Sequence, residues 1–346
     1  MRGARPRASP VGAAAVTQPV LVTGGAGFIG SHLVDQLVAS GSSVTVLDDF
    51  STGNERNLAG LAGDPRFVIR HGSVLDADLV DSLVERNPLV FHLAAAVGVR
   101  YIVDDPLGSV LTNVRGTENV LASCARHGAR LVLASTSEIY GRNTSVPFRE
   151  DAERVLGPTW MHRWSYSAAK AIDEHLAFAY SDRGLAVSIV RYFNSYGPRI
   201  DERGYGSVVA RFIAQALAGH AITVHGDGRQ TRCFTYVSDT VEGTLLAAQR
   251  PEALGKVFNI GAAEEISVQE LAETIRDIVG SRSPIALVPY ESSYPRGFED
   301  TRRRVPDVTR ARDELGFSAV VALRDGMSRT VAWCRANYAT AASSRS

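Results

Sequence analysis

The sequence is poor in lysine and cysteine, and it contains no long apolar run. Of its 37 lysine and arginine residues, only Lys170 and Lys256 are lysines. Cys124, Cys233 and Cys334 are far apart and lack metal-ligand spacing, which favours free thiols in a reducing compartment and no metal site. No segment approaches the ~20 apolar residues of a transmembrane helix, and the first 18 residues lack the apolar core of a secretory signal. We therefore expect a cytoplasmic protein with no membrane partner.

A strong charge of either sign is also absent. Lysine plus arginine number 37 and aspartate plus glutamate number 37, so the formal net charge is zero. Such a balance provides no overall electrostatic field that would attract nucleic acid, and we expect no nucleic-acid partner. At 346 residues the chain is long enough for a large core and for one to three domains.

The most informative stretch runs from Val20 to Gly30. Apolar β-formers lead into glycines at positions 24, 27 and 30, and an apolar-periodic segment follows, which predicts strand, turn and helix. Glycine lets a ligand approach the main chain, and a helix N-terminus attracts a pyrophosphate. A second strand, Val44 to Leu47, ends at Asp48, about 20 residues on, as a dinucleotide site requires. Asp48 would bind ribose hydroxyls and repel a 2′-phosphate, which favours NAD over NADP.

Strand and helix patterns keep alternating after Asp48. Strands are predicted at 67–70, 89–93, 130–134 and 187–191, with helices at 77–85, 106–126 and 166–183. The alternation predicts an α/β fold with a doubly wound parallel sheet (Rossmann) and a smaller C-terminal α/β part. We expect a flexible tail at 1–18, a cofactor domain at 19–200, a substrate-binding part at 201–337 with some strands returning to the first sheet, and a second tail at 338–346.

Side chains suited to acid–base chemistry follow the fifth strand and open the helix at 166–183. Thr136, Ser137 and Glu138 come directly after the strand, where open parallel sheets bind their ligands. Tyr166 and Lys170 are four residues apart and share one helix face. A phenol titrates near about 10, and a nearby ammonium or a hydroxyl such as that of Thr136 favours the phenolate. We predict that Tyr166 is a base acidified by Lys170.

The glycine pattern, Asp48, the Thr136 turn and the Tyr166/Lys170 pair together resemble the extended short-chain dehydrogenase/reductases that act on nucleotide sugars, over residues 19–337. The resemblance implies NAD as cofactor, a UDP-sugar as substrate and a homodimer formed through the helices at 106–126 and 166–183. It implies cofactor contacts for Gly24, Gly27, Phe28, Ile29, Gly30, Asp48, Asp49, Ser51, Thr52, Gly53, Ser73, Val74, Leu93, Ala94, Ala95, Tyr166 and Lys170. Ser73 stands where many members have an aspartate that contacts adenine.

The same resemblance implies where the substrate is bound. The implied contacts are Arg163, Asn194, Val209, His225, Gln230, Arg232 and Arg304. Arg232 and Arg304 would reach the diphosphate and the sugar, and a bidentate guanidinium suits a phosphate. Asn194 is alternatively a turn residue. His225 stands where the family more often has a tyrosine that stacks on the base.

The reaction is narrowed by two positions. The triplet Thr136, Ser137, Glu138 resembles that of UDP-glucuronate decarboxylases, whereas thymidine-sugar dehydratases carry Asp-Glu after the threonine and simple 4-epimerases usually lack the glutamate. Arg163, three residues before Tyr166, matches an arginine of the decarboxylases. GDP-mannose dehydratases share the triplet, but Asp48 argues against their preference for NADP.

We therefore predict an NAD-dependent decarboxylation of UDP-glucuronate through a 4-keto intermediate, giving UDP-xylose or UDP-4-keto-xylose. Two departures keep alternatives open: His162 replaces the proline that precedes the decarboxylase arginine, and the loop 97–105 is longer than theirs. The alternatives are a 4-epimerase of UDP-hexoses or UDP-uronates, a 4,6-dehydratase, and a non-catalytic, redox-sensing dinucleotide binder. The last class typically lacks the tyrosine or the lysine.

Overall fold

Seven parallel strands form the main sheet of the structure, a computed structural model that describes residues 17–98, 104–201, 207–290 and 300–343. The strand order is β11-β6-β5-β4-β1-β2-β3. The bounds are β1 Val20–Thr23, β2 Val44–Asp48, β3 Phe67–His71, β4 Leu89–His92, β5 Arg130–Thr136, β6 Val187–Tyr192 and β11 Val257–Ile260. The order runs outward from β1 in both directions, which confirms the predicted doubly wound sheet.

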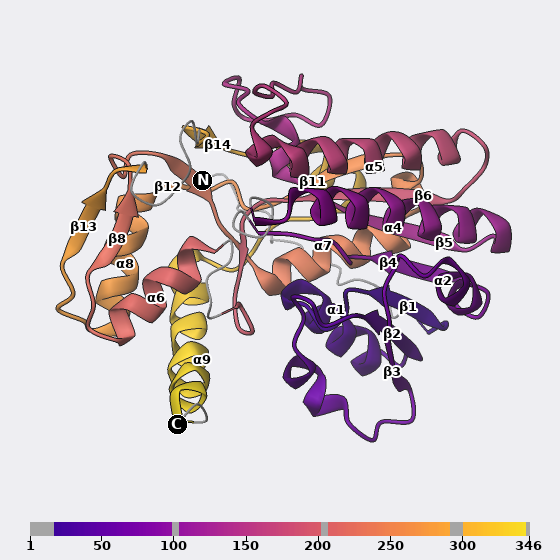
Figure 1. Cartoon of the computed structure of the whole chain (residues 1–346), viewed down its shortest axis with the longest axis horizontal. Coiled ribbons are helices and arrows are strands. Elements are labelled where there is room, and N and C mark those ends of the chain that lie inside the picture. The colour runs from indigo at the N-terminus through magenta and orange to yellow at the C-terminus, as the bar shows by residue number, and fades with distance from the viewer. Residues whose placement is uncertain (1–16, 99–103, 202–206, 291–299, 344–346) are drawn as a thin grey trace, which may run out of the picture.

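Helices cover both faces of this sheet (Figure 1). Helices α1 (Phe28–Ala39) and α7 (Val237–Gln249) pack on one face, and α2 (Ala77–Val84), α4 (Pro106–His127) and α5 (Ser165–Ser181) pack on the other. The central strands are apolar on both sides, because each face lies under helices; β1 is buried along its whole length. The 22-residue helix α4 begins with Pro106 and ends at Gly128, whose φ of +69° gives the left-handed cap that glycine favours.

A smaller α/β part lies beside the sheet, on the left in Figure 1. Its elements are α6 (Val208–Leu217), β8 (Ile222–His225), β9 (Thr231–Cys233), β12 (Glu265–Ser267), α8 (Val268–Val279), β13 (Ile285–Val288), β14 (Arg303–Arg304) and α9 (Leu323–Ser343). A separate core holds them together, with Phe212, Ile213, Leu271 and Ile275 fully buried. Between α6 and α8 the chain returns to the large sheet as α7 and β11, so the two parts are interleaved.

The described residues also include several short elements. They are β7 (Ser195–Tyr196) paired with β10 (Thr235–Tyr236), the 3-10 turns η1 (Glu55–Leu61), η2 (Ser137–Tyr140), η3 (His162–Trp164) and η4 (Pro251–Ala253), and the π turn η6 (Ala311–Leu315). Among the helices of the described residues, none has the length and apolarity to cross a lipid bilayer.

The C-terminal boundary differs from the prediction. We expected a flexible tail from residue 338, whereas α9 continues to Ser343. Tyr338 explains part of the extension, because its hydroxyl donates a hydrogen bond to the Ile200 carbonyl at 3.0 Å and its ring packs edge-on against Trp333. Alanine, a strong helix former, recurs beyond it. Most of the predicted N-terminal tail and the middle of the loop 97–105 lie outside the described residues.

Candidate active site

The glycine loop between β1 and α1 is packed so closely that side chains would not fit. A Cβ on Gly30 would lie 2.1 Å from the Gly24 carbonyl oxygen, and one on Gly24 would lie 2.6 Å from the Ala94 nitrogen. Gly24 also has a φ of +71°, which glycine alone adopts without strain. Helix α1 begins after Gly27 without a side-chain cap, so the N–H groups of Phe28 and Ile29 face the end of the sheet.

Asp48, at the end of β2, supports this loop as well as facing the expected ribose. Its carboxylate accepts hydrogen bonds from the Ala26 N–H at 2.8 Å and from the Phe50 N–H at 2.9 Å. Burial raises its pKa, and these two backbone donors oppose the rise. Gly53 packs against it, since a Cβ there would lie 2.8 Å from the Asp48 Oδ1. Sequence reasoning had assigned Asp48 only to the cofactor and missed its hold on the loop.

The remaining predicted cofactor residues gather at the same edge of the sheet. Asp49 is exposed and accepts hydrogen bonds from the Ser51 N–H at 2.9 Å and hydroxyl at 2.6 Å, and Thr52 follows. After β3, the Ser73 hydroxyl accepts from the Leu75 N–H at 3.2 Å, and Val74 is buried. After β4, Leu93 and Ala94 donate backbone hydrogen bonds to Thr23, and Ala95 comes next.

Tyr166 and Thr136 meet beyond the end of β5. The Thr136 side chain caps η2 by accepting from the Glu138 N–H at 3.1 Å, and a hydrogen bond joins it to Tyr166, in the first turn of α5. The pKa of Tyr166 in this arrangement is raised, whereas acidification was predicted. Burial, together with the charges of Glu138 and Asp173, raises the pKa of the phenol, and the Thr136 hydrogen bond opposes this only in part. The Lys170 ammonium has a carboxylate partner, because its Nζ donates a hydrogen bond to Asp173 Oδ2 at 2.8 Å.

Glu138 is held between two buried arginines, which we call the charged clamp (Glu138, Arg163 and Arg304). Arg163 contacts its Oε2 at 2.7 Å, and Arg304 contacts its Oε1 at 2.6 Å. Burial alone would raise the pKa of Glu138, but the two guanidiniums hold it well below its ordinary range. Sequence reasoning named all three residues for different roles and did not predict that they meet. Ser137, next to Glu138, is buried inside η2.

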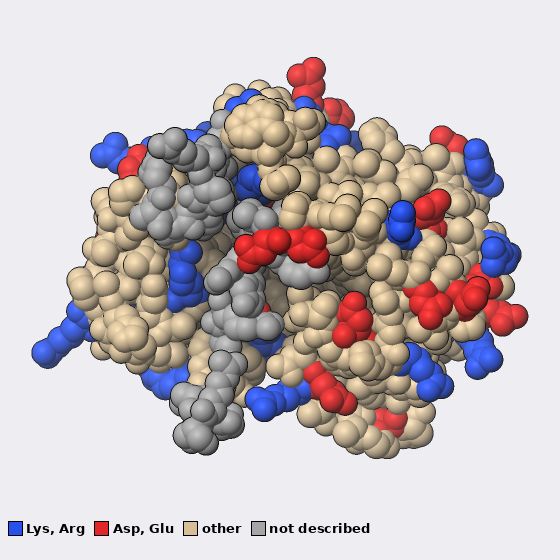
Figure 2. Space-filling view, in the orientation of Figure 1, with Lys and Arg blue, Asp and Glu red and all other residues tan. Residues whose placement is uncertain are grey.

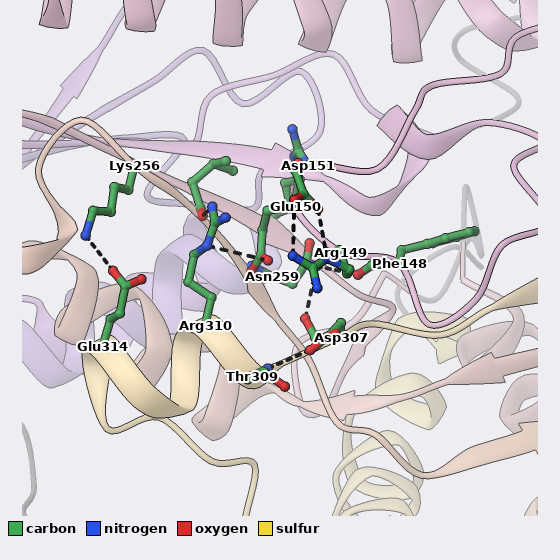
Figure 3. A network of polar contacts seen from close by, with 12 residues as sticks. Phe148, Arg149, Glu150, Asp151, Lys256, Asn259, Asp307, Thr309, Arg310 and Glu314 are labelled. Atoms are coloured by element: carbon green, nitrogen blue, oxygen red, sulfur yellow. Dashed lines mark hydrogen bonds and ion pairs between the residues drawn. The ribbon is translucent and has the colours of Figure 1, made fainter.

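A segment from the other end of the chain brings Arg304 to the clamp, and Figure 3 labels Phe148, Asn259 and Asp307, which contact one another next to it. Phe148 donates its N–H to the Val305 carbonyl at 2.7 Å and accepts the Asp307 N–H at 2.8 Å. The side-chain amide of Asn259, in β11, donates to the carbonyls of Phe148 at 2.8 Å and Asp307 at 3.1 Å. Asn259 therefore ties this segment to the large sheet.

Arg232 lies next to the clamp on the side of the smaller part. It is paired in register with Arg304 through β9 and β14. Its guanidinium donates to the carbonyls of Thr231 at 2.7 Å and Thr301 at 2.8 Å, and it contacts Asp300 at 2.7 Å. Arg232 is therefore a buried cation beside the clamp.

An aromatic residue that the sequence analysis did not name lies beside His225. Strands β8 and β13 pair so that Tyr290 follows beside His225, with ring centroids 6.2 Å apart. Gln230 donates to the His225 carbonyl at 2.9 Å and to the Tyr290 hydroxyl at 3.2 Å. The signal in the sequence is a single aromatic residue two positions after the short apolar stretch that forms β13. A tyrosine thus stands near the position where His225 departs from the family pattern.

Two other predicted substrate residues have structural roles. Val209 is 1% exposed, and its side chain packs within the core of the smaller part, whereas a substrate contact was predicted for this residue. It lies on the buried stripe of the amphipathic helix α6. Asn194 has a φ of +38° and donates its side-chain amide to the Cys233 carbonyl at 3.0 Å, so it shapes a turn as the alternative interpretation held.

Fold and site together define a dinucleotide-type α/β protein whose polar residues gather at the carboxyl ends of the strands. Residues 21–330 match the GDP-mannose 4,6 dehydratase family, and the chain belongs to that family. It is 44% identical over 316 residues to a UDP-N-acetyl-alpha-D-glucosaminuronate decarboxylase of Bacillus cytotoxicus, covering 91% of this chain and 97% of the relative. It is 38% identical to UDP-glucuronic acid decarboxylase 1 of Arabidopsis thaliana, covering 95% and 72%.

Solved structures of related enzymes share the fold. The dTDP-glucose 4,6-dehydratase of Streptomyces venezuelae, solved with NAD bound, superposes with a TM-score of 0.84 at 31% identity, covering 93% of this chain and 98% of that one. The match spans both the large sheet and the smaller part. It is consistent with the α/β architecture and with the family membership.

Proposed function

We propose that this protein decarboxylates UDP-glucuronate with NAD as its cofactor. The observation that carries the proposal is the charged clamp, in which Glu138 lies between Arg163 and Arg304 close to Tyr166. Two guanidiniums against one carboxylate leave one net positive charge there. Such a site favours an anionic sugar, as a uronate is. The named activities of the two decarboxylase relatives support the same choice.

The residues of the glycine loop fit NAD. A loop without room for a Cβ at Gly24 and Gly30 admits a pyrophosphate against its backbone, and the uncapped start of α1 supplies N–H donors. Asp48 would take the ribose hydroxyls with its remaining lone pairs and disfavour a 2′-phosphate. The bound NAD would supply a hydride acceptor at the sugar C4 and a hydride donor after decarboxylation. Lys170 and Tyr166 would hold its nicotinamide end.

Tyr166 would remove the proton from the C4 hydroxyl as that carbon is oxidised. Thr136 would donate a hydrogen bond to the phenolate that forms. The pKa of Tyr166 is raised in the described structure, so this step needs a cation nearby. Lys170 is placed to supply it, one turn away on α5.

Decarboxylation follows from the position of the new ketone. It lies β to the C5 carboxylate, so carbon dioxide can leave while its electrons pass into an enolate. Glu138 would position the sugar and the water that protonates C5, with Arg304 and Arg163 orienting the anionic groups. The Nε of Arg304 is buried and has no hydrogen-bond partner among the described residues, so it can donate to such a group. Return of the hydride would give UDP-xylose, and release before that return would give UDP-4-keto-xylose.

The low pKa of Glu138 separates this site from that of the thymidine-sugar dehydratases. Such an enzyme uses a carboxylic acid to protonate the departing hydroxyl, whereas the two guanidiniums of the clamp keep Glu138 ionised. Ser137 occupies the position where thymidine-sugar dehydratases carry an aspartate, and a serine is no acid at neutral pH. Loss of carbon dioxide requires no such acid at the leaving group.

The proposal leaves open which substituent the sugar carries at C2. The relative with 44% identity is named for an N-acetylated uronate, which is a second candidate substrate. Parallel incubations with UDP-glucuronate, UDP-N-acetylglucosaminuronate, UDP-glucose and UDP-galactose, followed by mass spectrometry, separate the cases. The proposal predicts that a uronate loses the mass of carbon dioxide if UDP-xylose is the product, and the mass of carbon dioxide and two hydrogens if UDP-4-keto-xylose is released. Interconversion of the hexoses without that loss would identify an epimerase.

We also propose a cytoplasmic homodimer. Helices α4 and α5 lie side by side on one face of the sheet, and each leaves a large apolar side chain exposed: Leu107 is 69% and Ile172 is 45% exposed. In the view of Figure 2, both signs of charge occur over the larger part of the molecule. The three cysteines are buried and unpaired, as in a reducing compartment. Light scattering at micromolar concentration should give the mass of a dimer, and a monomer mass would contradict it.

A further inference from the structure

Lys170 is paired with a buried carboxylate that sequence reasoning did not single out. Asp173, one turn further along α5, has no exposed surface, and Lys170 is 2% exposed. The Lys170 Nζ lies 2.8 Å from the Asp173 Oδ2. A buried ammonium this close to a buried carboxylate is held in one position, because moving either charge leaves the other without compensation.

A chain of buried polar groups leads from Asp173 to the cofactor loop. The Thr117 side chain, on α4, hydrogen-bonds Asp173. The Thr117 hydroxyl lies 3.1 Å from the His92 Nε2, and the His92 Nδ1 lies 2.7 Å from the Thr23 hydroxyl. The Thr23 oxygen accepts the Ala94 N–H at 3.3 Å. All four side chains, those of Thr23, His92, Thr117 and Asp173, are at most 1% exposed.

The hydrogen bonds between these buried groups can be donated in only one direction along the series. Burial and the Lys170 charge lower the pKa of His92 to about 3, so its ring is neutral and carries one N–H. An ionised carboxylate can only accept, so Asp173 fixes the direction and Thr117 donates to it. The single N–H of His92 is then on Nε2 and donates to Thr117, and Thr23 donates to His92 Nδ1. Asp173 is therefore the final acceptor of both this chain and Lys170.

We propose that Asp173 is a positioning residue that fixes the Lys170 ammonium and, through Thr117, His92 and Thr23, the ends of β1 and β4 beside the glycine loop. This proposal rests on the proposed use of NAD and refines it. It predicts that one carboxylate away from the reacting atoms affects both cofactor binding and the ionisation of the base.

The charged groups around Tyr166 determine whether replacing Asp173 raises or lowers the pKa of the base. Glu138 from η2 and Asp173 from α5 both raise the pKa of Tyr166, and Glu138 is itself neutralised by Arg163 and Arg304. His92 from β4 is neutral, and Lys170 is the cation on α5. Removing the charge of Asp173 while keeping its shape should therefore lower the pKa of the base.

The test compares Asp173→Asn, which keeps an acceptor but removes the charge, with Asp173→Ala, which removes both. Asp182→Asn is the matched control, because Asp182 is an exposed carboxylate at the C-cap of the same helix. Three quantities are measured for each: the dissociation constant of NAD by calorimetry on cofactor-free protein, the melting temperature, and kcat against pH with the uronate that the wild type converts.

We expect Asp173→Ala to weaken NAD binding about tenfold or more, since a charge-assisted hydrogen bond and its buried relay are lost. Asp173→Asn should weaken it less and should move the acid limb of the pH profile down by about one pH unit. Asp182→Asn should leave all three quantities unchanged. If Asp173→Ala does not fold, Asp173→Asn alone decides the outcome.

The proposal is overturned if Asp173→Asn lowers the melting temperature while its NAD affinity and its pH profile match those of the wild type. That result would mean that Asp173 is only structural. If the wild type converts no uronate but the variants still bind NAD more weakly than Asp182→Asn, the proposed reaction fails and the positioning role stands.

Discussion

The glycine loop and the charged clamp lie at the same edge of the sheet but are built by different physical means. The loop spans residues 24–30, carries no charge, and works because backbone atoms come within 2.1–2.6 Å of where a Cβ would stand. The clamp brings together η2, η3 and β14, and Arg304 is 166 positions from Glu138. Substitutions in the loop should therefore act through steric exclusion, whereas substitutions in the clamp should act through charge and depend on pH.

Tyr166 stands between these two regions and should give the largest effect. Tyr166→Phe removes the base but keeps the ring, so kcat should fall by about 10²–10⁴-fold. The NAD dissociation constant should stay close to that of the wild type, because the glycine loop is untouched. Steady-state kinetics and calorimetry measure the two quantities. Tyr180→Phe, on the same helix α5, is the control and should retain full activity.

The clamp should show the next largest effect in a stability measurement. Glu138→Gln leaves two buried guanidiniums facing each other without a carboxylate, and the free energy of unfolding at pH 7 should fall by about 3 kcal/mol. Because the pKa of Glu138 is lower in the folded protein than its ordinary value, ionisation favours folding, and this stability is fully present above the unfolded pKa. The difference from the wild type should narrow as the pH falls below about 4.5. Urea titrations from pH 7 to pH 3 check this, and a constant difference would contradict the clamp.

The glycine loop should respond to a single methyl group. Gly30→Ala places a Cβ against the Gly24 carbonyl and the Gly25 backbone, so the loop must shift, at a cost of roughly 1–3 kcal/mol. NAD affinity should fall about tenfold, with no dependence on pH between 5 and 8. Gly60→Ala is the matched control, because a Cβ at Gly60 would meet nothing within 4 Å. Equal affinities for the two variants would contradict the steric account of the loop.

Asp48 should give the smallest effect, since it serves both the loop and the ribose. Asp48→Asn keeps one side-chain oxygen for a backbone N–H and removes the charge that repels a 2′-phosphate. The ratio of the NADP and NAD dissociation constants should move toward NADP by less than about tenfold. Asp182→Asn, which neutralises an exposed carboxylate at the end of α5, is the comparison and should leave the ratio unchanged. A wild type that prefers NADP would refute the role of Asp48.

The glycine loop is made of residues close together in the sequence and the clamp of distant ones, and this difference explains what could be predicted from the sequence. The parallel sheet, the glycine loop and the pairing of Tyr166 with Lys170 on α5 depend on residues within one or two turns or on a strand and the turn after it, so their spacing carries the signal. Glu138, Arg163 and Arg304 were each named, but their meeting depends on Asn259 tying the segment near Arg304 to Phe148, and no local pattern encodes that contact.

Three other features escaped prediction for a similar reason. Tyr290 reaches His225 only because β13 pairs with β8, and Val209 is buried only because α6 packs its apolar stripe on α8. Asp173 reads in the sequence as an ordinary polar residue of an amphipathic helix. It becomes a buried partner of Lys170 because α4 covers that side of α5.

The central claim is tested most directly by the release of carbon dioxide from UDP-glucuronate labelled at its C6 carboxyl. The wild type should release labelled carbon dioxide in step with substrate consumption, and Tyr166→Phe, measured beside it, should release almost none. If UDP-xylose is the product, NADH should not accumulate, since the hydride returns to the sugar. A wild type that releases no labelled carbon dioxide from UDP-glucuronate, yet interconverts UDP-glucose and UDP-galactose, would contradict the account and identify an epimerase.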